Sequence, residues 1–382
     1  MNMKVCLELQ PYLKTKSGIG VYTYEISRCL EQISKDSINL QVFNFKNKMD
    51  MNRKLLGIEA NKDECRVMPY SVYRRIWHYL PISYNSLFKQ QGDIYHFFDY
   101  IVPPRIRGKV VTTVHDMTYE LYPETMQKTT LERIKKDINY SVERADKVIT
   151  ISESTKRDMM SILKISEEKI EIIPPGVDFE RFNKSYTALQ VQGVKERYQL
   201  PENYILYMGT LEPRKNIESI VEAFALMKKE SDHSVQKIKL VIAGKKGWLY
   251  ESIFNKVRQL DIESEVVFTD FIEEEHKPII YQLAKAFVFP SIYEGFGIPV
   301  LEAMAASVPV ITSDVSSLPE VAGDAAFLVA PKDKEKIAES MYTLITDEAS
   351  REQLRLRGLK QARKFSWRAS AEKLYHIYEE LV

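Results

Sequence analysis

Two glutamates have the type and spacing to act on a polar ligand. Glu294 and Glu302 lie in the segment 290–309, which reads PSIYEGFGIPVLEAMAASVP. The apolar run just before it, residues 286–289, is typical of a buried parallel strand, and the glycines and proline that follow predict a helix that begins near Gly297. Glu294 therefore precedes the helix and Glu302 falls about one turn inside it. We expect both carboxylates to face the same opening of a binding site, at different depths.

The start of this helix suits an anion. Its first backbone N–H groups lack partners within the helix and carry the positive end of the helix dipole, so a diphosphate fits beside Gly295, Phe296, Gly297 and Ile298. Carboxylates repel a phosphate, so we interpret the two glutamates as acceptors of hydrogen bonds from hydroxyl groups, which sugars and riboses supply.

The alternative role for each glutamate is compensation of the helix dipole, which is worth roughly 0.3 to 1 kcal/mol. This alternative stays open for Glu302, which lies inside the helix. It is weaker for Glu294, because Ser, Thr, Asp and Asn are the preferred residues ahead of a helix.

Length and composition limit what surrounds this segment. The 382 residues predict two domains, and 54 basic against 53 acidic side chains give a net charge of +1, so no nucleic-acid partner is expected. Three scattered cysteines, Cys6, Cys29 and Cys65, indicate reduced thiols rather than a zinc or disulfide framework. Neither a signal peptide nor a membrane span is evident, so we expect a cytoplasmic protein, soluble or peripheral on the inner face of the membrane.

Short apolar runs alternate with amphipathic segments, which is typical of parallel sheets flanked by helices. The runs form two series, which predict two doubly wound halves. The predicted strands of the first half are 4–9, 40–45, 94–98, 110–115, 147–151 and 169–173, with helices such as 20–32 and 131–144 between them. The predicted strands of the second half are 204–208, 239–243, 265–268, 286–289, 308–312 and 326–329. The domains are placed at 1–180 and 200–365, with a linker near 178–200 and a C-terminal helix at 366–382.

In the first half, Gly18 and Gly20 form a glycine-containing loop after the first strand. Thr23 occupies the place of the last glycine in the dinucleotide fingerprint G-x-G-x-x-G, which disfavours a dehydrogenase. His115 ends a predicted strand, at the sheet edge where catalytic groups gather. The alternative for His115 is a histidine satisfied within its loop by Asp116.

In the second half, two cations follow the first strand. Arg214 and Lys215 could neutralise a diphosphate, and the alternative is that both are solvated surface residues. Phe271 and Ile272 follow the strand at 265–268 and are candidates for a nucleotide-base pocket, although core packing is the alternative for at least one of them.

The string EGFGIPVLEAMA, in which seven residues separate Glu294 from Glu302, resembles the E-x7-E signature of retaining glycosyltransferases of family 4. The resemblance covers nearly the whole chain. It implies the GT-B fold, an α/β architecture of two doubly wound Rossmann-like domains that face an interdomain cleft. It also implies an N-terminal acceptor domain, a C-terminal nucleotide-sugar donor domain and a terminal helix that crosses back to the first domain.

The resemblance further implies transfer of a sugar from a nucleotide diphosphate sugar, with anomeric retention and no metal or other cofactor. His115 and Glu294 would contact the donor sugar, and Glu302 the ribose. The remaining donor-binding residues would be Gly18, Gly20, Arg214, Lys215, Phe271, Ile272, Gly295, Phe296, Gly297 and Ile298. The chain departs from the commoner family pattern at Thr210, where arginine is usual.

The strings GTLEPRKN and VHDM look most like bacterial mannosyltransferases that build surface polysaccharides. GDP-mannose is therefore the first choice of donor, with a glycan or lipid-linked glycan as acceptor. UDP-hexoses and dTDP-rhamnose stay open as donors, as do a GT-B nucleotide-sugar epimerase and a catalytically silent nucleotide-sugar-binding subunit.

The segment 74–80, RRIWHYL, mixes basic with aromatic residues, and Tyr70, Tyr73 and Tyr84 lie nearby in the sequence. Such a segment can rest on an anionic membrane surface, with its aromatic rings at the interface. The alternative is an ordinary helix whose aromatic rings pack in the core.

Overall fold

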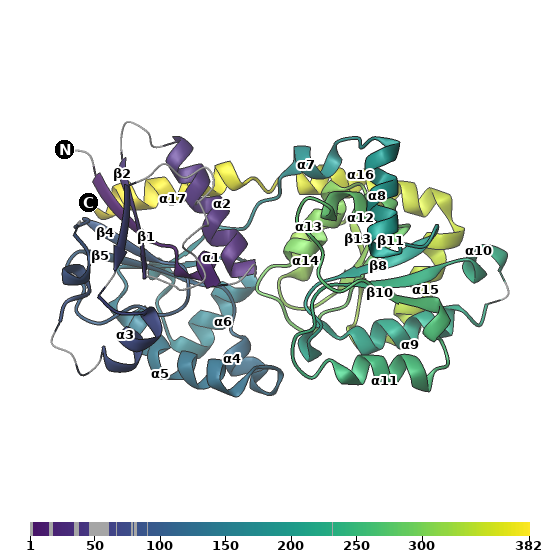
Figure 1. Cartoon of the computed structure of the whole chain (residues 1–382), viewed down its shortest axis with the longest axis horizontal. Helices are drawn as coiled ribbons and strands as arrows, with labels where there is room; N and C mark the ends of the chain where they lie inside the picture. Colours follow the sequence, from purple (N-terminus) through teal and green to yellow (C-terminus); the bar gives the residue numbers. More distant parts are fainter. Residues whose placement is uncertain are drawn as a thin grey trace. The chain divides into compact units, whose positions relative to one another are not determined.

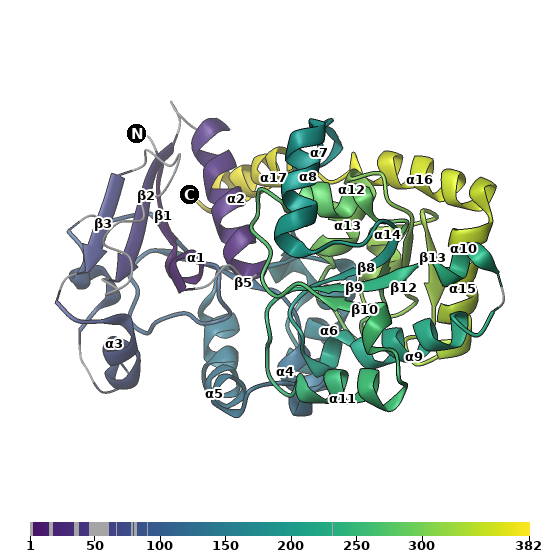
Figure 2. The ribbon, with the colours of Figure 1, turned by 45° about the vertical axis from the view of Figure 1, so that its right-hand side comes forward.

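The computed structural model describes residues 3–14, 18–33, 38–45, 61–65, 67–77, 79, 82–89, 91–230 and 232–382. The chain divides into two compact units. The first consists of Met1–Leu121, Lys128–Pro175 and Trp367–Val382, and the second of Tyr122–Gln127 and Gly176–Ser366. Each unit contains one parallel sheet with helices on both of its faces (Figure 1, Figure 2).

The sheet of the first unit has seven strands in the order β3-β2-β1-β4-β5-β6-β7. The strands are β1 (Met3–Glu8), β2 (Ile38–Phe45), β3 (Asn61–Cys65), β4 (Ile94–Phe97), β5 (Lys109–Val114), β6 (Lys147–Thr150) and β7 (Ile170–Ile172). Each neighbouring pair is parallel. The strand order changes direction between β1 and β4, and such a switch point is where open α/β sheets bind ligands, at the carboxyl ends of the strands.

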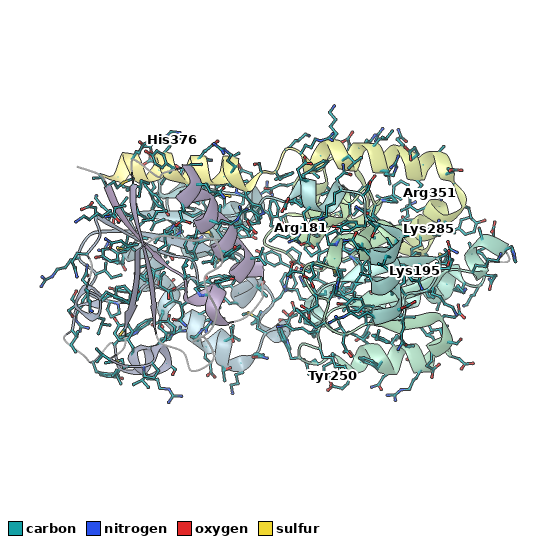
Figure 3. The ribbon with its side chains drawn as sticks, turned by 45° about the horizontal axis from the view of Figure 1, so that its top comes forward. Arg181, Lys195, Tyr250, Lys285, Arg351 and His376 are labelled. Atoms are coloured by element: carbon teal, nitrogen blue, oxygen red, sulfur yellow. The ribbon has the colours of Figure 1, made fainter. Side chains whose placement is uncertain are left out.

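The helical elements of the first unit are α1 (Gln10–Lys14), α2 (Gly18–Ile33), α3 (Tyr70–Ile76), η1 (Tyr84–Leu87), α4 (Thr118–Leu121), α5 (Lys128–Arg144), α6 (Glu153–Leu163), η3 (Glu167–Lys169) and α17 (Trp367–Leu381). The last of these packs against α2, where the ring of Trp367 meets Tyr22 edge-on at 5.9 Å. Its apolar residues Trp367, Leu374, Ile377 and Tyr378 are buried, while His376 lies on the exposed face (Figure 3).

A buried hydrogen-bonded chain ties α17 to the first sheet. The Tyr378 hydroxyl lies 2.5 Å from Nδ1 of His96 on β4, and Nε2 of His96 lies 2.8 Å from Oγ1 of Thr113 on β5. Burial lowers the pKa of His96 to about 3, so this imidazole is neutral at physiological pH.

The sheet of the second unit has six strands in the order β10-β9-β8-β11-β12-β13. They are β8 (Tyr204–Met208), β9 (Lys239–Ala243), β10 (Val266–Phe268), β11 (Ala286–Phe289), β12 (Val310–Ser313) and β13 (Ala326–Val329), and each neighbouring pair is parallel. The order again changes direction once, between β8 and β11. Both sheets therefore have the doubly wound Rossmann order, which confirms the predicted fold class.

The helical elements of the second unit are η2 (Pro123–Thr125), α7 (Phe179–Asn183), α8 (Ala188–Tyr198), η4 (Pro213–Lys215), α9 (Ile217–Met227), α10 (His233–Gln236), α11 (Glu251–Gln259), η5 (Glu263–Glu265), α12 (Lys277–Leu283), α13 (Ile298–Ala305), α14 (Leu318–Ala322), α15 (Lys334–Thr346) and α16 (Glu348–Ala362). None of the helices that the structure describes combines the length and the apolar character that crossing a membrane requires.

The segment expected to be a linker, 178–200, instead contains α7 and α8 and belongs to the second unit. A capping box starts α8, because the Thr187 side chain accepts from the Gln190 backbone and the Gln190 side chain accepts in return. This motif was readable in the sequence as T-A-L-Q. Arg181 and Lys195 (Figure 3) ion-pair with residues of the same unit, which further fixes the segment.

Candidate functional site

The loop after β11 leads directly into α13, as the sequence predicts. Gly297 caps the helix with φ +113°, a backbone conformation that favours glycine. A Cβ atom there would also lie 2.7 Å from Cδ2 of Leu318. The helix starts at Ile298 and carries a proline in its first turn. Proline is tolerated there because the N–H groups of the first turn have no acceptor within the helix, so the missing N–H costs nothing.

Serines that follow β12 hold this loop in place. Ser316 Oγ accepts from the backbone N–H of Glu294 at 3.0 Å, and Ser317 Oγ lies 2.9 Å from the Glu294 carbonyl and 2.8 Å from the Phe296 carbonyl. Ser313, the last residue of β12, donates to a carbonyl of the same loop at 2.6 Å. The sequence signal for these residues, a run of polar residues SDVSS at the end of a buried strand, was not used in predicting the site.

Glu294 lies between the two predicted cations. Its Oε1 is 2.5 Å from Nζ of Lys215, and its Oε2 is 3.0 Å from Nη1 of Arg214. Burial alone would raise the pKa of Glu294, but the charges of Arg214 and Lys215 outweigh burial and lower the pKa to about 2. Glu294 is therefore ionised throughout the physiological range.

Arg214 makes further contacts that fix its guanidinium group. It donates to the Tyr293 carbonyl at 2.5 Å and to Oε1 of the buried Glu212 at 2.8 Å. The four charged groups of this cluster, Glu212, Arg214, Lys215 and Glu294, are two cations and two anions. Arg214 and Lys215 are thus mostly buried ion-pair partners and not solvated surface residues.

The topology brings these distant residues together. Arg214 and Lys215 follow β8 and Glu294 follows β11, and the two strands are neighbours at the switch point of the second sheet. Asn216, with φ +57°, donates from its side chain to the Pro290 carbonyl at 3.0 Å and so ties the two loops to each other. The sequence-predicted residues Arg214, Lys215 and Glu294 therefore form one cluster at the ligand-binding edge of the sheet.

Glu302 has a different set of partners. It is buried on α13, its Oε2 accepts from the Tyr281 hydroxyl at 3.0 Å, and its Oε1 lies 3.9 Å from Nζ of Lys277. Burial raises the pKa of Glu302 above its ordinary value, although the charge of Lys277 opposes the shift. The two glutamates share no partner among the contacts of the described residues, so Glu302 is supported from α12 and Glu294 from the loop after β8.

The other predicted residues of the second unit divide between surface and core. Phe271 is 43% exposed and Ile272 is 3% exposed, so only the first presents its side chain outward. Phe296 is buried, and its ring meets Phe365 at 5.5 Å. Gly295 is buried beside it, and Ile298 is partly exposed at the start of α13.

The candidates of the first unit lie near the carboxyl edge of its sheet. Gly18 and Gly20 belong to the first turn of α2 and not to a loop before it, and the preceding Ser17 lies outside the described residues. His115 directly follows β5, and its Nε2 lies 2.8 Å from the Phe98 carbonyl, to which it donates. Burial lowers the pKa of His115. The hydrogen-bond partner of His115 is thus the Phe98 carbonyl, while Asp116 acts on His115 through its charge and its side chain accepts from the Thr118 backbone at 2.9 Å.

The segment 74–80, for which membrane contact and core packing were both open, is largely internal. Tyr73, Trp77 and Tyr84 are each 1% exposed, and Arg74 ion-pairs with Asp137. The ring of Tyr73 packs against those of Trp77 and Tyr84. This arrangement agrees with the alternative that the aromatic rings of the segment pack in the core. Arg75 and Tyr79 are exposed, while His78 and Leu80 lie outside the described residues.

Comparison with known families identifies both units. Residues 16–181 match the family described as Glycosyltransferase Family 4, and residues 193–361 match the family described as Glycosyl transferases group 1. The chain belongs to family 4 of the GT-B glycosyltransferases. Its enzyme class is therefore that of a glycosyltransferase, as the sequence predicted.

Relatives of this glycosyltransferase include named mannosyltransferases. It is 28% identical over 392 residues to O-antigen chain mannosyltransferase B of Escherichia coli, covering 99% of this chain and 100% of the relative. It is 35% identical over 231 residues to serotype-specific mannosyltransferase WbdA of Escherichia coli, covering 60% of this chain and 28% of WbdA. O-antigen chain mannosyltransferase RfbU of Salmonella typhimurium is 32% identical over 231 residues, covering 60% of this chain and 59% of RfbU.

Solved structures show the same fold at low identity. Sucrose-phosphate synthase from Thermosynechococcus elongatus matches with a TM-score of 0.77 at 19% identity, over 100% of this chain and 99% of that one. WaaG, described as a glycosyltransferase involved in lipopolysaccharide biosynthesis, matches with a TM-score of 0.70 at 16% identity, over 98% and 99% of the two chains. These likenesses support the GT-B architecture of the glycosyltransferase.

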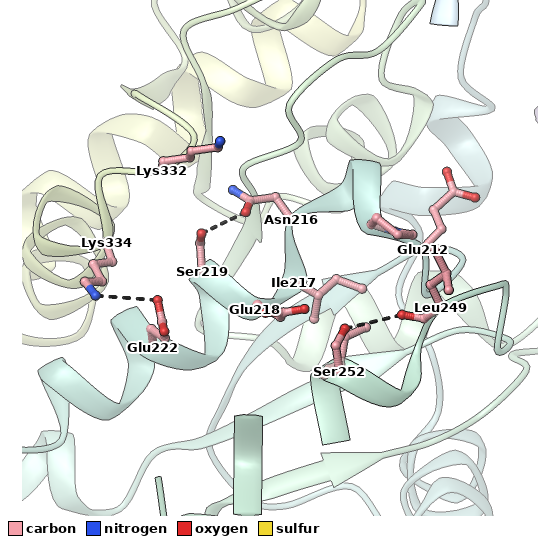
Figure 4. Close-up of a pocket in the computed structure, with 12 residues that line it drawn as sticks. Glu212, Asn216, Ile217, Glu218, Ser219, Glu222, Leu249, Ser252, Lys332 and Lys334 are labelled. Atoms are coloured by element: carbon pink, nitrogen blue, oxygen red, sulfur yellow. Dashed lines mark hydrogen bonds and ion pairs between the residues drawn. The ribbon is translucent and has the colours of Figure 1, made fainter. Parts of the chain in front are cut away.

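A pocket of about 360 Å³ lies beside the charged cluster of the second unit (Figure 4). It shares Glu212 with that cluster, and Lys334 on its opposite wall points to Glu222 at 3.6 Å. Its lining residues are Glu212, Pro213, Asn216, Ile217, Glu218, Ser219, Glu222, Leu249, Ser252, Ile253, Lys332 and Lys334. The predicted donor-binding residues are not among them, but Pro213 and Asn216 flank Arg214 and Lys215 in the sequence, so the pocket adjoins the candidate donor site.

Among the residues that the structure describes, no group of three or more His, Cys, Asp or Glu side chains could hold a metal ion. Cys6, Cys29 and Cys65 are buried and form no disulfide, and Sγ of Cys6 donates to Oε1 of Gln41 at 3.3 Å.

Proposed function

We propose that the chain is a retaining hexosyltransferase that moves mannose from GDP-mannose to a glycan or lipid-linked glycan during cell-surface polysaccharide biosynthesis. The observation that carries the proposal is the ionised Glu294 between Arg214 and Lys215 at the switch point of the second sheet. The mannosyltransferase names of the relatives in Escherichia coli and Salmonella typhimurium support the choice of sugar.

In this proposal the cations stabilise the departing diphosphate. Once the donor is bound, Arg214, Lys215 and the first backbone N–H groups of α13 would contact the diphosphate and stabilise the charge that develops on it. Lys215 and Arg214 exchange part of their contact with Glu294 for phosphate oxygens when the donor binds. No bound metal is needed for this step, because the neutralising charge comes from the protein.

Glu294 accepts hydrogen bonds from hydroxyl groups of the donor sugar. Its low pKa makes it a weak base and a poor candidate for the carboxylic acid that glycosidases use, so we assign no nucleophile and acid pair. Retention then follows from attack on the same face that the diphosphate leaves, with a leaving phosphate oxygen accepting the proton of the acceptor hydroxyl. The neutral His115 contributes a hydrogen bond to the donor sugar, and Glu302 holds the ribose.

A panel of nucleotide sugars tests the donor. A ligand that binds only the folded protein raises its melting temperature by mass action, so GDP-mannose should raise it more than UDP-hexoses or dTDP-rhamnose. The largest shift with a UDP or dTDP sugar would reassign the donor. The same assay in excess EDTA should give the same shifts, and a shift that requires added Mg²⁺ would contradict metal-free binding.

Acceptor-dependent release of GDP tests the reaction class. A mannosyltransferase releases GDP faster when a mannose-terminated glycan is present, and NMR of the product should show the anomeric configuration of the donor. An epimerase would convert the donor without acceptor, and a silent subunit would bind the donor without turnover. Either outcome would overturn the proposed activity.

We propose a cytoplasmic location, with peripheral contact to the inner face of the membrane when the acceptor is lipid-linked. In the segment 74–80, the exposed Arg75 on α3 and the exposed Tyr79 shortly after it suit an anionic surface. Co-sedimentation with vesicles of phosphatidylglycerol, compared with phosphatidylcholine, tests the contact. Equal recovery with both vesicle types would contradict it.

A further inference from the structure

Four charged side chains gather beside the sheet of the first unit, and we call them the arginine–aspartate cluster. They are Arg74 on α3, Asp99 two residues after β4, and Arg133 and Asp137 on α5. Nη2 of Arg74 lies 3.8 Å from Oδ2 of Asp137, and Nη2 of Arg133 lies 3.9 Å from Oδ2 of Asp99. The cluster thus joins two helices to the end of a strand.

The cluster lies at the switch point of the first sheet. Glu8 ends β1 and Asp99 follows β4, and these two strands are the neighbours between which the strand order changes direction. Asp99 is also near enough to His115 for its charge to act on the imidazole. Burial lowers the pKa of His115, and the negative charge of Asp99 opposes this shift. The cluster therefore occupies the place where an open α/β sheet binds a ligand, next to a residue assigned to the donor sugar.

The two arginines have hydrogen-bond donors to spare. Both ion pairs are too long to be hydrogen bonds. Nη2 of Arg74 and Nε of Arg133 are buried nitrogen atoms that find no acceptor among the residues the structure describes. Buried donors are costly when unpaired, so a ligand that supplies acceptor atoms would relieve this cost.

The cluster is accessible from one side. The Arg133 and Asp99 side chains are 33% and 22% exposed, whereas those of Arg74 and Asp137 are 12% and 7% exposed. A ligand could therefore reach the outer pair from solvent and meet the inner pair behind it.

The charges of the cluster select the kind of ligand. With the nearby Glu8, which is 6% exposed, three carboxylates accompany two guanidinium groups, so a phosphate would be repelled. A sugar hydroxyl both accepts from a guanidinium and donates to a carboxylate, and therefore satisfies both members of each pair. The ring of Tyr70, which interacts electrostatically with these groups, adds an apolar surface of the kind that sugar rings contact.

We propose that the arginine–aspartate cluster is the acceptor subsite, and that it binds a neutral sugar residue of the acceptor through adjacent hydroxyl groups. This proposal rests on the proposed function, because its ligand is the acceptor of that reaction. It assigns the acceptor to side chains that the donor does not need.

Saturation-transfer NMR without donor tests the subsite, with α-1,2-mannobiose and GDP as separate probes. The variants are Arg133→Ala and Asp99→Asn, and the matched control is Arg144→Ala, which removes another partly exposed arginine of α5 that pairs with Asp146. Loss of a charged hydrogen bond should weaken mannobiose binding by about 10-fold or more in the first two variants. GDP binding in all proteins and mannobiose binding in the control should stay unchanged.

Unchanged mannobiose binding in both Arg133→Ala and Asp99→Asn would overturn the subsite, as would the absence of mannobiose binding to the parent protein. Displacement of mannobiose by equimolar inorganic pyrophosphate, dependent on Arg133, would overturn the neutral ligand and favour a phosphate of a lipid carrier. If the parent protein binds mannobiose but not GDP, the proposed donor fails while the subsite stands.

Discussion

Nζ of Lys215 lies 2.5 Å from Oε1 of Glu294, although 79 positions separate the two residues in the sequence. The contact forms because their loops follow β8 and β11, which are neighbours at the switch point of the second sheet. Arg214 holds the other carboxylate oxygen, so the charge of Glu294 is fixed from two sides. The consequences of removing each member of this arrangement can be measured separately.

Replacing Glu294 by glutamine should abolish most of the transfer reaction. The amide keeps the size of the side chain but loses the charge that accepts hydroxyl groups, so we expect kcat to fall on the order of 100-fold or more. Acceptor-dependent GDP release measures the change, and circular dichroism checks the fold. Glu348→Gln is the control, because Glu348 is an exposed residue in the first turn of α16 whose ion pair is with Arg351 of the same helix, outside the cluster of Glu212, Arg214, Lys215 and Glu294. Full activity of Glu294→Gln would refute the assignment of Glu294 to the donor sugar.

Lys215→Met should weaken the binding of GDP. The change removes a cation that pairs with Glu294 and that we expect to contact the diphosphate, so the Kd for GDP should rise about 10-fold or more. Isothermal titration calorimetry of GDP and of guanosine separates the phosphate contact from the base contact. An equal loss of affinity for both ligands would place Lys215 near the base and contradict the proposed role.

Much of this site could be predicted from the sequence, because the strand–turn–helix around Glu294 has strong local signals. Gly297, the preceding apolar strand and the proline after it each fit one local conformation. The partnership of Glu294 with Arg214 and Lys215 followed only from knowing which strands are neighbours. The alternation of strands and helices indicates a doubly wound sheet, and in that strand order β8 and β11 are neighbours.

Other features depended on contacts that spacing does not reveal. The serines after β12 contact the Glu294 loop through a strand pairing, and Tyr281 reaches Glu302 from another helix. β3 reads NKDEC, which lacks the alternation of apolar and polar residues typical of a strand. Its extended conformation therefore follows from its pairing with β2 and not from its own side chains. For Tyr73 and Trp77 the sequence left both a surface patch and core packing open, because it does not show which side of a short helix is buried.

Gly244→Ala should destabilise the second unit strongly. A Cβ atom at Gly244, which has φ +138°, would lie 1.9 Å from the carbonyl oxygen of Gly209, so the loops after β9 and β8 would have to separate. We expect a loss of about 3 kcal/mol or more, comparable to other strained core substitutions. Gly193→Ala on α8 is the control, because nothing lies within 4 Å of its added Cβ, and it should stabilise by about 0.5 to 1 kcal/mol. Urea denaturation measures both, and similar midpoints for the two variants would contradict the packing argument.

Stability should decline as the pH falls below about 6.5, first as the buried His96 and His115 favour the protonated unfolded chain and then, below about 4.5, as Glu294 does. The pKa of His96 is lowered from 6.5 to about 3 and that of Glu294 from 4.5 to about 2. As the pH falls, each of these groups takes up a proton in the unfolded chain before it does so in the folded protein. The contribution of each group to stability is therefore fully present above its pKa in the unfolded chain and is lost as the pH falls toward its pKa in the folded protein. Urea midpoints between pH 7 and pH 3 measure the slope. His96→Asn should flatten the step from 6.5 downward and Glu294→Gln the step below 4.5; unchanged slopes in these variants would contradict the assignment.

Glu302→Gln should act on donor binding and not on the chemical step. Glutamine can still accept from the Tyr281 hydroxyl but offers less charge to the ribose hydroxyl groups, so KM for GDP-mannose should rise about 10-fold while kcat changes little. Tyr281→Phe separates this from a purely structural role, because it removes the donor at 3.0 Å from Glu302 and leaves the carboxylate in place. That variant should lose about 1 kcal/mol of stability and keep KM within about twofold. A fall in kcat with unchanged KM in Glu302→Gln would instead assign Glu302, like Glu294, to the reacting sugar.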